Sequence, residues 1–317
     1  MKLTDFGALT LVALLWGVNF VAAKVGLTAF TLWEFRVAAF GGGALVLVVI
    51  ALCTGTSLRL RRRGDTLRLL LAGSLSVGGF GVFSALALLH TTAGRATIGV
   101  YTMPIWVVLL ASVLLNEPLT RRRILSLALG ASGLLVLALP QFLAGEWLGL
   151  TCAIAAAVSW ALGTVLLKRA AVDAPPITTT AWQLIAGSAV CAVGLVLAPR
   201  QEPLILTGDA VLGVLYNLVF GTVIAYLIWF TLLRRIPAGA AGIGTLLVPV
   251  FGVLASFALL GEIPTSADLA GLALIVLAAG FPLFPDRAAS PGPAAPVPGG
   301  APSGEAGASD QSGGPPG

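Results

Sequence analysis

The sequence has few charged residues for its length. Only 10% of its 317 residues are Asp, Glu, Lys or Arg, whereas about 25% is usual in soluble domains. Hydrophobic residues make up 58% of the chain, and a soluble protein of that composition would expose large apolar patches. The shortage of charge therefore excludes an ordinary soluble domain and indicates that lipid surrounds most of this chain.

Residues that commonly perform catalysis or bind metals are also scarce. The chain has one histidine, His90, and its three cysteines, Cys53, Cys152 and Cys191, lack the spacing of metal ligands. It has no Ser-His-Asp set, no paired carboxylates deep in an apolar run and no G-x-x-x-x-G-K-[ST] phosphate loop. These absences argue against an enzyme, against a metal or other cofactor, and against a transporter driven by ATP.

Long apolar segments dominate instead. We count ten of roughly 20 residues, the length that crosses a bilayer as a helix, and their Leu, Ala and Val content favours helices over a barrel. The predicted spans are residues 6–26, 31–53, 67–89, 96–115, 124–143, 147–167, 178–198, 210–233, 239–260 and 267–284. The predicted fold is therefore an all-α integral membrane protein with ten transmembrane helices.

A duplication runs through these segments. Residues 91–120 and 236–265 are identical at 12 of 30 positions without a gap, and the shared residues include a proline, a glutamate and a threonine. A weaker similarity upstream aligns Trp16 with Trp160. Because each copy holds five helices, an odd number, the second copy must enter the membrane upside down relative to the first. The sequence therefore predicts an inverted repeat, an architecture that suits alternating access.

The predicted domains are a first repeat at 6–143, a second repeat at 147–284 and a tail at 286–317. The tail is rich in Pro, Gly, Ala and Ser, so we expect it to be a disordered cytoplasmic segment. With the N-terminus inside the cell, 14 of the 18 Lys and Arg residues fall in cytoplasmic segments, and only Arg95 and Arg200 fall in outer loops. This bias predicts that both termini are cytoplasmic. The basic loops face anionic lipid headgroups, and we see no nucleic-acid site.

Several stretches resemble one family. The segment AYLIWFTLLRRIPAGAAGIGTLLVPVFGVLASFALLGEIPT (225–265) looks like the second-repeat signature of the EamA-like family of the drug/metabolite transporter superfamily. Residues 86–120 resemble its first-repeat counterpart, and residues 13–27 and 33–45 are similar to its first two helices. The resemblance covers residues 6–284. It implies two inverted five-helix halves around a central substrate cavity, and export of amino acids, other metabolites or drugs without an ATP-binding domain.

On this basis we expect a secondary transporter that exports a small metabolite, either amino acid-like or amphipathic, by alternating access. Its partners would be that small molecule and the lipid bilayer, and coupling to protons remains an open hypothesis. The Ala, Arg and Gly content suggests a bacterial source, which would place the protein in the inner membrane as a multi-pass protein. The alternative is a polytopic protein that does not transport, such as a lipid-modifying enzyme or a scaffold.

Polar and aromatic residues at membrane depth usually face a cavity or a partner. We predict that the substrate is bound by Trp16, Asn19, Tyr101, Thr102, Trp160 and Asn217. Pro104 and Pro249 are matched between the repeats, and a proline in a membrane helix frees a carbonyl and kinks the helix. This pair of kinked helices points to the cavity, although a kink can also serve packing alone.

Three charged residues lie near the predicted outer boundary. Lys24, Glu34 and Arg36 are interpreted as gating or interfacial charges. Lys24 can reach the outer headgroups or form an ionic lock, a pairing of Glu34 with Lys24 is one option, and an interfacial anchor is the preferred role of Arg36. The repeated phrases LLNEPLT and LLGEIPT, which contain Glu117 and Glu262, are interpreted as two copies of a helix–turn–helix joint.

Overall fold

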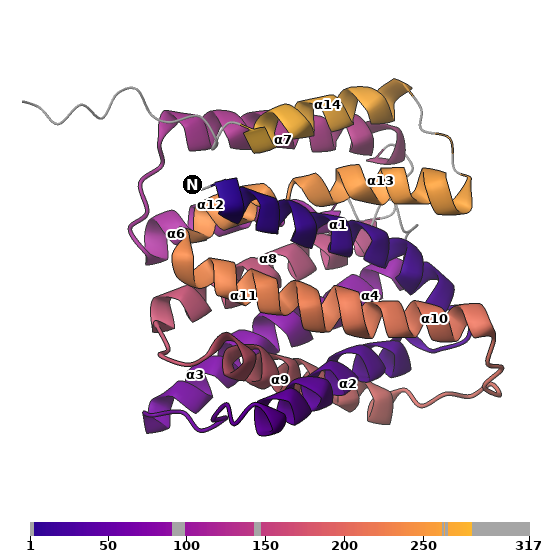
Figure 1. Ribbon diagram of the computed structural model, residues 1–317. Coiled ribbons are helices and arrows are strands. Elements are labelled where there is room, and N and C mark those ends of the chain that lie inside the picture. Colours follow the sequence, from indigo (N-terminus) through magenta and orange to yellow (C-terminus); the bar gives the residue numbers. More distant parts are fainter. Residues whose placement is uncertain (1–2, 91–98, 143–146, 262, 264–265, 281–317) are drawn as a thin grey trace, which may run out of the picture. The chain divides into compact units, whose positions relative to one another are not determined.

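The described part of the chain is helical throughout (Figure 1). A computed structural model describes residues 3–90, 99–142, 147–261, 263 and 266–280. Within these ranges the chain forms helices, turns and loops and no β-strand. The predicted all-α fold class is confirmed for this part of the chain.

The helices follow one another through two halves of the chain. In the first half they are α1 (Leu3–Gly26), α2 (Leu32–Cys53), α3 (Arg63–Gly73), η1 (Ser74–Gly79), α4 (Phe80–His90), α6 (Met103–Leu114) and α7 (Arg121–Phe142). In the second half they are α8 (Trp147–Ala170), α9 (Pro176–Leu197), α10 (Gly208–Tyr216), η2 (Asn217–Ile224), α11 (Ala225–Arg235), α12 (Ala238–Gly244), α13 (Leu247–Leu260) and α14 (Ser266–Gly280). The segments η1 and η2 are π-helical.

Seven helical runs of the described chain are long and apolar enough to cross a membrane. Two shorter apolar helices cover Met103–Leu114 and Leu269–Ala278. These observations agree with a multi-pass membrane protein, whereas the number of ten spans stays a prediction. The predicted tail at 286–317 lies outside the described residues.

Large apolar side chains are exposed on the outward faces of these helices. Leu52 is 71% exposed, Val113 74% and Leu197 79%. In water each such side chain would lose the roughly 1.5–3 kcal/mol that its burial provides, but hydrocarbon tails remove that cost. The outward faces therefore suit a lipid environment.

Helices of one half pack mainly against helices of the other half (Figure 1). Helix α2 packs on α9, and α7 packs on α14. Helix α1 contacts α10, α11 and α13, while α8 makes the corresponding contacts with α3, α4 and α6. Each of these contacts of α1 with helices of the second half therefore has a counterpart, in which α8 contacts the matched helix of the first half.

The predicted helix over 96–115 is interrupted beside Pro104. We expected one kinked helix over 96–115, but the structure has a turn at Tyr101–Thr102 and places Pro104 in the first turn of α6. Proline is tolerated there because the first turn of a helix leaves its N–H groups unpaired in any case. The second half has the same break, with a turn at Thr245–Leu246 and Pro249 in the first turn of α13. Both prolines thus lie just after a break in a helical run, so the structure has an interruption beside each proline, as predicted.

Candidate substrate cavity

A cavity of about 80 Å³ lies among α1, α2, α4, α6, α8, η2 and α11. That volume is several times the space of roughly 10–15 Å³ that one water molecule needs. Five of the six predicted substrate-binding residues line it, namely Trp16, Asn19, Tyr101, Trp160 and Asn217. They come from α1, the turn before α6, α8 and η2, so both halves contribute and the fold brings together residues up to 201 positions apart in the sequence.

Aromatic rings form one end of the cavity. The ring centroids of Trp16 and Trp160, which occupy matched positions of the repeat, lie 6.2 Å apart in an edge-to-face arrangement. Trp229 packs 4.9 Å from Trp160, and Tyr226 packs 5.7 Å from Trp16. Such rings offer a large apolar surface at fixed geometry. We call Trp16, Trp160 and Tyr226, which line the cavity, together with Trp229 packed behind them, the aromatic end. The lining rings can bind the apolar part of a small molecule.

Two amides provide a polar edge beside the aromatic end. The Asn217 side-chain nitrogen Nδ2 donates a hydrogen bond to Asn19 Oδ1 at 2.7 Å. The indole Nε1 of Trp16 donates to the Gly221 carbonyl at 3.0 Å, which fixes the orientation of that ring. Because buried polar groups need partners, these bonds hold the amides and the indole in place when no substrate is bound.

Arg36 also lines the cavity, although its sequence position suggested an interfacial anchor. Its Nη2 donates a hydrogen bond to Ser84 Oγ at 3.1 Å, and Ser84 in turn donates to the Gly81 carbonyl at 3.2 Å. The guanidinium carbon lies 5.7 Å from the ring centroid of Phe40 and 5.9 Å from that of Phe35. The cavity therefore has a cation in its wall.

Thr102, Lys24 and Glu34, which were also predicted as site or gating residues, do not line the cavity. Thr102 donates to the Gly99 carbonyl at 2.7 Å and accepts from Trp106 Nε1 at 3.2 Å, so its hydroxyl serves the turn before α6. Lys24 is exposed on α1 and does not line the cavity.

Glu34 begins α2 and makes a network of its own. It closes a capping box with Thr31, accepting from the Thr31 N–H at 2.8 Å. Its carboxylate also forms an ion pair with Arg200, whose Nε lies 2.9 Å from Oε1. Arg200 donates further to the Ala29 carbonyl at 2.7 Å. The loop after α9 is thereby fastened to the start of α2.

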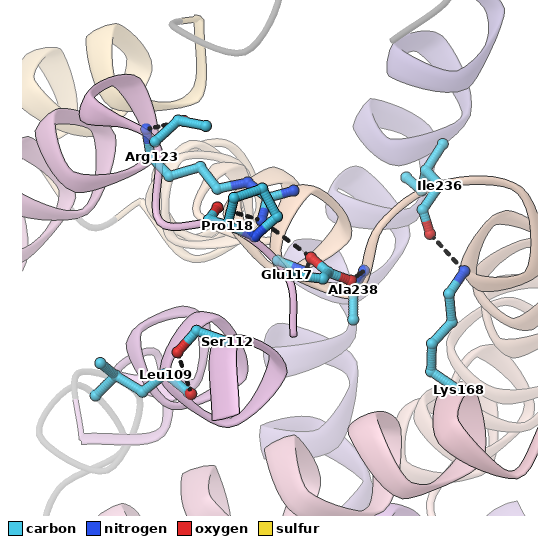
Figure 2. Close-up of polar contacts among 10 residues, drawn as sticks. Leu109, Ser112, Glu117, Pro118, Arg123, Lys168, Ile236 and Ala238 are labelled. Carbon is cyan, nitrogen blue, oxygen red and sulfur yellow. Dashed lines mark hydrogen bonds and ion pairs between the residues drawn. The ribbon is translucent and has the colours of Figure 1, made fainter. Parts of the chain in front are cut away.

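A second polar cluster lies where α11 ends and α12 begins, and Figure 2 shows it around the connection between these helices. Glu117 accepts hydrogen bonds from the N–H groups of Ala238 (2.8 Å) and Gly239 (3.3 Å) and pairs with Arg123 at 3.0 Å. Lys168 Nζ donates to the Ile236 carbonyl at 2.7 Å and to the Leu233 carbonyl.

We call Glu117, Arg123, Lys168 and the α11–α12 connection the polar joint. A carboxylate at the first N–H groups of α12 and an ammonium at the last carbonyls of α11 both match the sign of the helix dipoles. Glu117 follows α6 in the first half, whereas Lys168 ends α8 in the second half. The joint therefore fastens the α11–α12 connection to both halves.

Some cavity residues were not predicted. Tyr226, Phe20 and Ser84 were not among the predicted substrate-binding residues, yet all three line the cavity. For Phe20 the signal was present, since it lies four residues after Trp16 and so on the same face of the helix. In the described part of the chain no group of three His, Cys, Asp or Glu side chains can hold a metal ion.

Comparison with known proteins identifies the family. The EamA-like transporter family matches this chain twice, over residues 6–139 and 147–283. The chain belongs to the EamA-like transporter family. It is thus a membrane transporter-family protein that acts on small molecules, and not an enzyme.

Individual relatives agree with this membership. An uncharacterized transporter of Bacillus subtilis, YoaV, is 26% identical over 267 residues, which cover 83% of this chain and 91% of YoaV. A probable amino-acid metabolite efflux pump of Salmonella typhimurium is 29% identical over 282 residues, covering 84% of this chain and 90% of the pump. A solved crystal structure superposes with a TM-score of 0.75 at 22% identity, covering 89% of this chain and 97% of the other, which shows a shared fold.

Proposed function

We propose that this EamA-like protein is a secondary transporter that exports a small metabolite through the described cavity by alternating access. The contact between Trp16 and Trp160 carries the proposal, because matched residues of the two halves meet in one cavity wall. If the halves exchange conformations, these residues remain at the cavity while access moves from one side of the membrane to the other.

The proposed architecture is ten transmembrane helices in two inverted repeats, 6–143 and 147–284, with both termini in the cytoplasm. Its support is the exchange symmetry of the helix contacts, together with the matched breaks before α6 and α13. The π-helical segments also fall at matched places, η1 in the third helix of the first half and η2 in the third helix of the second. The bias of basic residues sets the orientation.

The two ends of the cavity differ, which suggests the conformational state. Its lining includes Ala23 near the end of α1, Arg36 near the start of α2 and Ser84 near the end of α4. All three positions lie toward the outer side in the proposed orientation. The polar joint lies at the inner side, where α8 and α11 end. We infer that this structure has its inner side closed by the polar joint.

The substrate we propose is amino acid-like or amphipathic, because aromatic rings and amides share the cavity wall. The name of the Salmonella relative, a probable amino-acid metabolite efflux pump, agrees with that class. We further propose Trp16, Asn19, Tyr101, Trp160 and Asn217 as substrate contacts, a location in the bacterial inner membrane, and protons as a candidate coupling ion.

Untargeted metabolite profiling tests the function. Cells that overexpress the protein should release at least one metabolite faster than cells with an empty vector. Asn19→Ala should reduce this release, because losing an amide that bonds the substrate costs roughly 1–3 kcal/mol, or about 5–150-fold in affinity. Arg61→Gln, which alters only an exposed ion pair with Asp173, is the matched control.

Reconstitution separates the mechanism from cellular effects. The released metabolite should cross proteoliposome membranes that contain the purified protein without ATP, and an imposed proton gradient should change the rate if protons are coupled. If no metabolite changes in cells and none crosses in proteoliposomes, the proposed transport function is wrong.

A further inference from the structure

Arg36 is a cation in a membrane protein, and the described carboxylates pair with other residues or lie outside the cavity lining. Among the described residues, its one hydrogen-bond partner is the neutral hydroxyl of Ser84. The other groups close to it are the Phe35 and Phe40 rings, the Cys191 thiol and the Tyr226 hydroxyl. None of these groups carries a negative charge at neutral pH. The guanidinium charge is therefore not neutralised within the described structure.

Such an arrangement is unusual for a structural arginine. Charged side chains within membrane helices are costly, and they commonly pair with an opposite charge or mark a substrate path. The aromatic rings of Phe35 and Phe40 stabilise a cation by up to about 2 kcal/mol, but they leave its net charge in place. Structural ion pairs in this same chain look different, because Glu34 and Glu117 each lie against an arginine. Arg36 has a hydroxyl where those arginines have a carboxylate.

The surroundings of Arg36 indicate what could neutralise it. The residue lines the same cavity as Trp16 and Trp160, and among the described residues no Asp or Glu belongs to that lining. A guanidinium presents a planar fork of N–H donors that matches a carboxylate in two parallel hydrogen bonds. The described lining has one arginine and no lysine, which suits one negative charge rather than two.

We propose that Arg36 binds the carboxylate of the transported molecule, while the aromatic end of the cavity holds its apolar part. The inference rests on the proposed transport function and narrows its substrate class to amphipathic monocarboxylates, amino acids included. Ser84 orients the guanidinium when the cavity is empty, because its hydroxyl accepts from Nη2 and is itself held by the Gly81 carbonyl. The substrate carboxylate then completes the neutralisation of the charge.

Binding of three matched probes to the purified full-length protein tests the inference. The probes are 3-phenylpropanoate, its neutral amide 3-phenylpropanamide and the cation 3-phenylpropylammonium, which share one apolar body. In lipid nanodiscs the affinity for the carboxylate should exceed the affinity for the amide by about 10- to 100-fold. Hydrogen bonds to charged groups contribute more binding free energy than neutral hydrogen bonds, and the difference corresponds to an affinity ratio of about this size. The ammonium should bind most weakly, because Arg36 repels it.

Three variants assign the preference to Arg36. Arg36→Gln should abolish the preference for 3-phenylpropanoate and leave binding of 3-phenylpropanamide within about twofold. Arg36→Lys keeps the charge without the planar fork, so its preference should be intermediate. Arg61→Gln removes an exposed arginine from the loop before α3 and should bind all three probes as the unaltered protein does. Thermal unfolding of each variant confirms that it is folded, and if Arg36→Gln does not fold, Arg36→Lys and the unaltered protein decide.

The outcomes separate this inference from the proposed function. Equal binding of carboxylate and amide, a preference for the ammonium, or a preference that survives in Arg36→Gln would overturn the role of Arg36 and leave the transport proposal standing. If none of the three probes binds, the role of Arg36 is likewise overturned, whereas the transport proposal is decided separately by the release and proteoliposome measurements.

Discussion

At the scale of single residues, Asn19 illustrates how one amide can have two roles. It lines the cavity, and its Oδ1 also accepts a hydrogen bond from Asn217 that joins α1 to η2. Hydrogen bonds between membrane helices contribute only about 0.6 kcal/mol on average and about 1.7 kcal/mol at most. The bond therefore positions the two amides without dominating the stability of the protein, so an effect of Asn19 on substrate affinity can be measured in folded protein.

A double-mutant cycle on Asn19→Ala and Asn217→Ala should show coupling. We expect an interaction energy of about 0.6–1.7 kcal/mol in the free energy of unfolding in mixed detergent micelles, because each single variant already breaks the shared hydrogen bond. The control cycle pairs Asn19→Ala with Ser132→Ala, an exposed residue whose hydroxyl bonds within its own helix. That control should be additive. Strict additivity of the Asn19 and Asn217 variants would contradict the observed bond.

At the scale of helical elements, the π-helical segments explain why some cavity residues escaped prediction. Asn217 and Tyr226 are nine residues apart, about two and a half turns of an α-helix, which would put them on opposite sides. The segment η2 lies between them, and its wider turns rotate Tyr226 back to the cavity. Periodicity in the sequence assumes one helix type, so it could not place Tyr226.

Other parts of the site were accessible to sequence reasoning. Trp16 and Trp160 were found because the duplication aligns them, and a polar residue at membrane depth drew attention to Asn19 and Asn217. The partner of Glu34 could not be predicted in this way. Arg200 follows Glu34 by 166 positions, and nothing in the local sequence links the two residues. Pairings between distant loops depend on which helices pack against each other. The apolar pattern predicts only which helix positions are buried and which are exposed, so it does not identify the neighbouring helices.

Close packing at η1 gives a prediction for one glycine. A Cβ atom at Gly163 of α8 would lie 2.5 Å from the Ser76 nitrogen and 2.6 Å from the Ala72 carbonyl oxygen, and these backbone atoms cannot move aside cheaply. We expect Gly163→Ala to destabilise the protein by about 1–3 kcal/mol, which thermal unfolding in detergent would detect.

The matched control is Gly7→Ala, because no atom lies within 4 Å of a Cβ at that position of α1. Alanine is a better helix former than glycine by up to about 1 kcal/mol, so this variant should be neutral or slightly stabilising. If Gly163→Ala behaves like Gly7→Ala, α8 does not approach η1 as closely as described.

The polar joint gives the second prediction for an element. Glu117→Gln keeps the shape of the side chain but loses the ion pair with Arg123 and the charged acceptor for the first N–H groups of α12. Hydrogen bonds to charged groups contribute about 1.5–3 kcal/mol, so we expect a lower unfolding temperature. Affinity for 3-phenylpropanoate should stay within about twofold, because Glu117 does not line the cavity.

Glu202→Gln, in the exposed loop after α9, is the control for loss of a carboxylate and should change neither property. A large change in affinity with unchanged stability in Glu117→Gln would show instead that the joint acts on the cavity. In that case the role of Glu117 as part of a structural connection would be wrong.

At the scale of the whole molecule, the repeated phrases LLNEPLT and LLGEIPT illustrate what duplication preserves. Asn116 and Gly261 occupy matched positions, and both adopt a left-handed backbone, with φ of 53° and 70°. Asparagine and glycine are the residues that tolerate this conformation best. The two copies therefore keep the same left-handed residue after α6 and α13, although only the first copy's glutamate lies within the described residues. Conserved local geometry in two copies is compatible with opposite orientations in the membrane, since a helix ending is the same structure on either side.

That opposite orientation leads to the last prediction, which concerns membrane topology. Two exposed positions, Arg62 before α3 and Glu202 before α10, should lie on opposite sides of the membrane, because an odd number of proposed spans separates them. In a background with Cys53, Cys152 and Cys191 replaced by alanine, we expect Glu202→Cys to react with a membrane-impermeant maleimide in intact cells. Arg62→Cys should react only after the cells are permeabilised, since the basic segment around it is proposed to be cytoplasmic. Permeabilised cells provide the control that both thiols are reactive. Labelling of Arg62→Cys from outside, with Glu202→Cys protected, would reverse the orientation, and labelling of both from one side would contradict the inverted repeat itself.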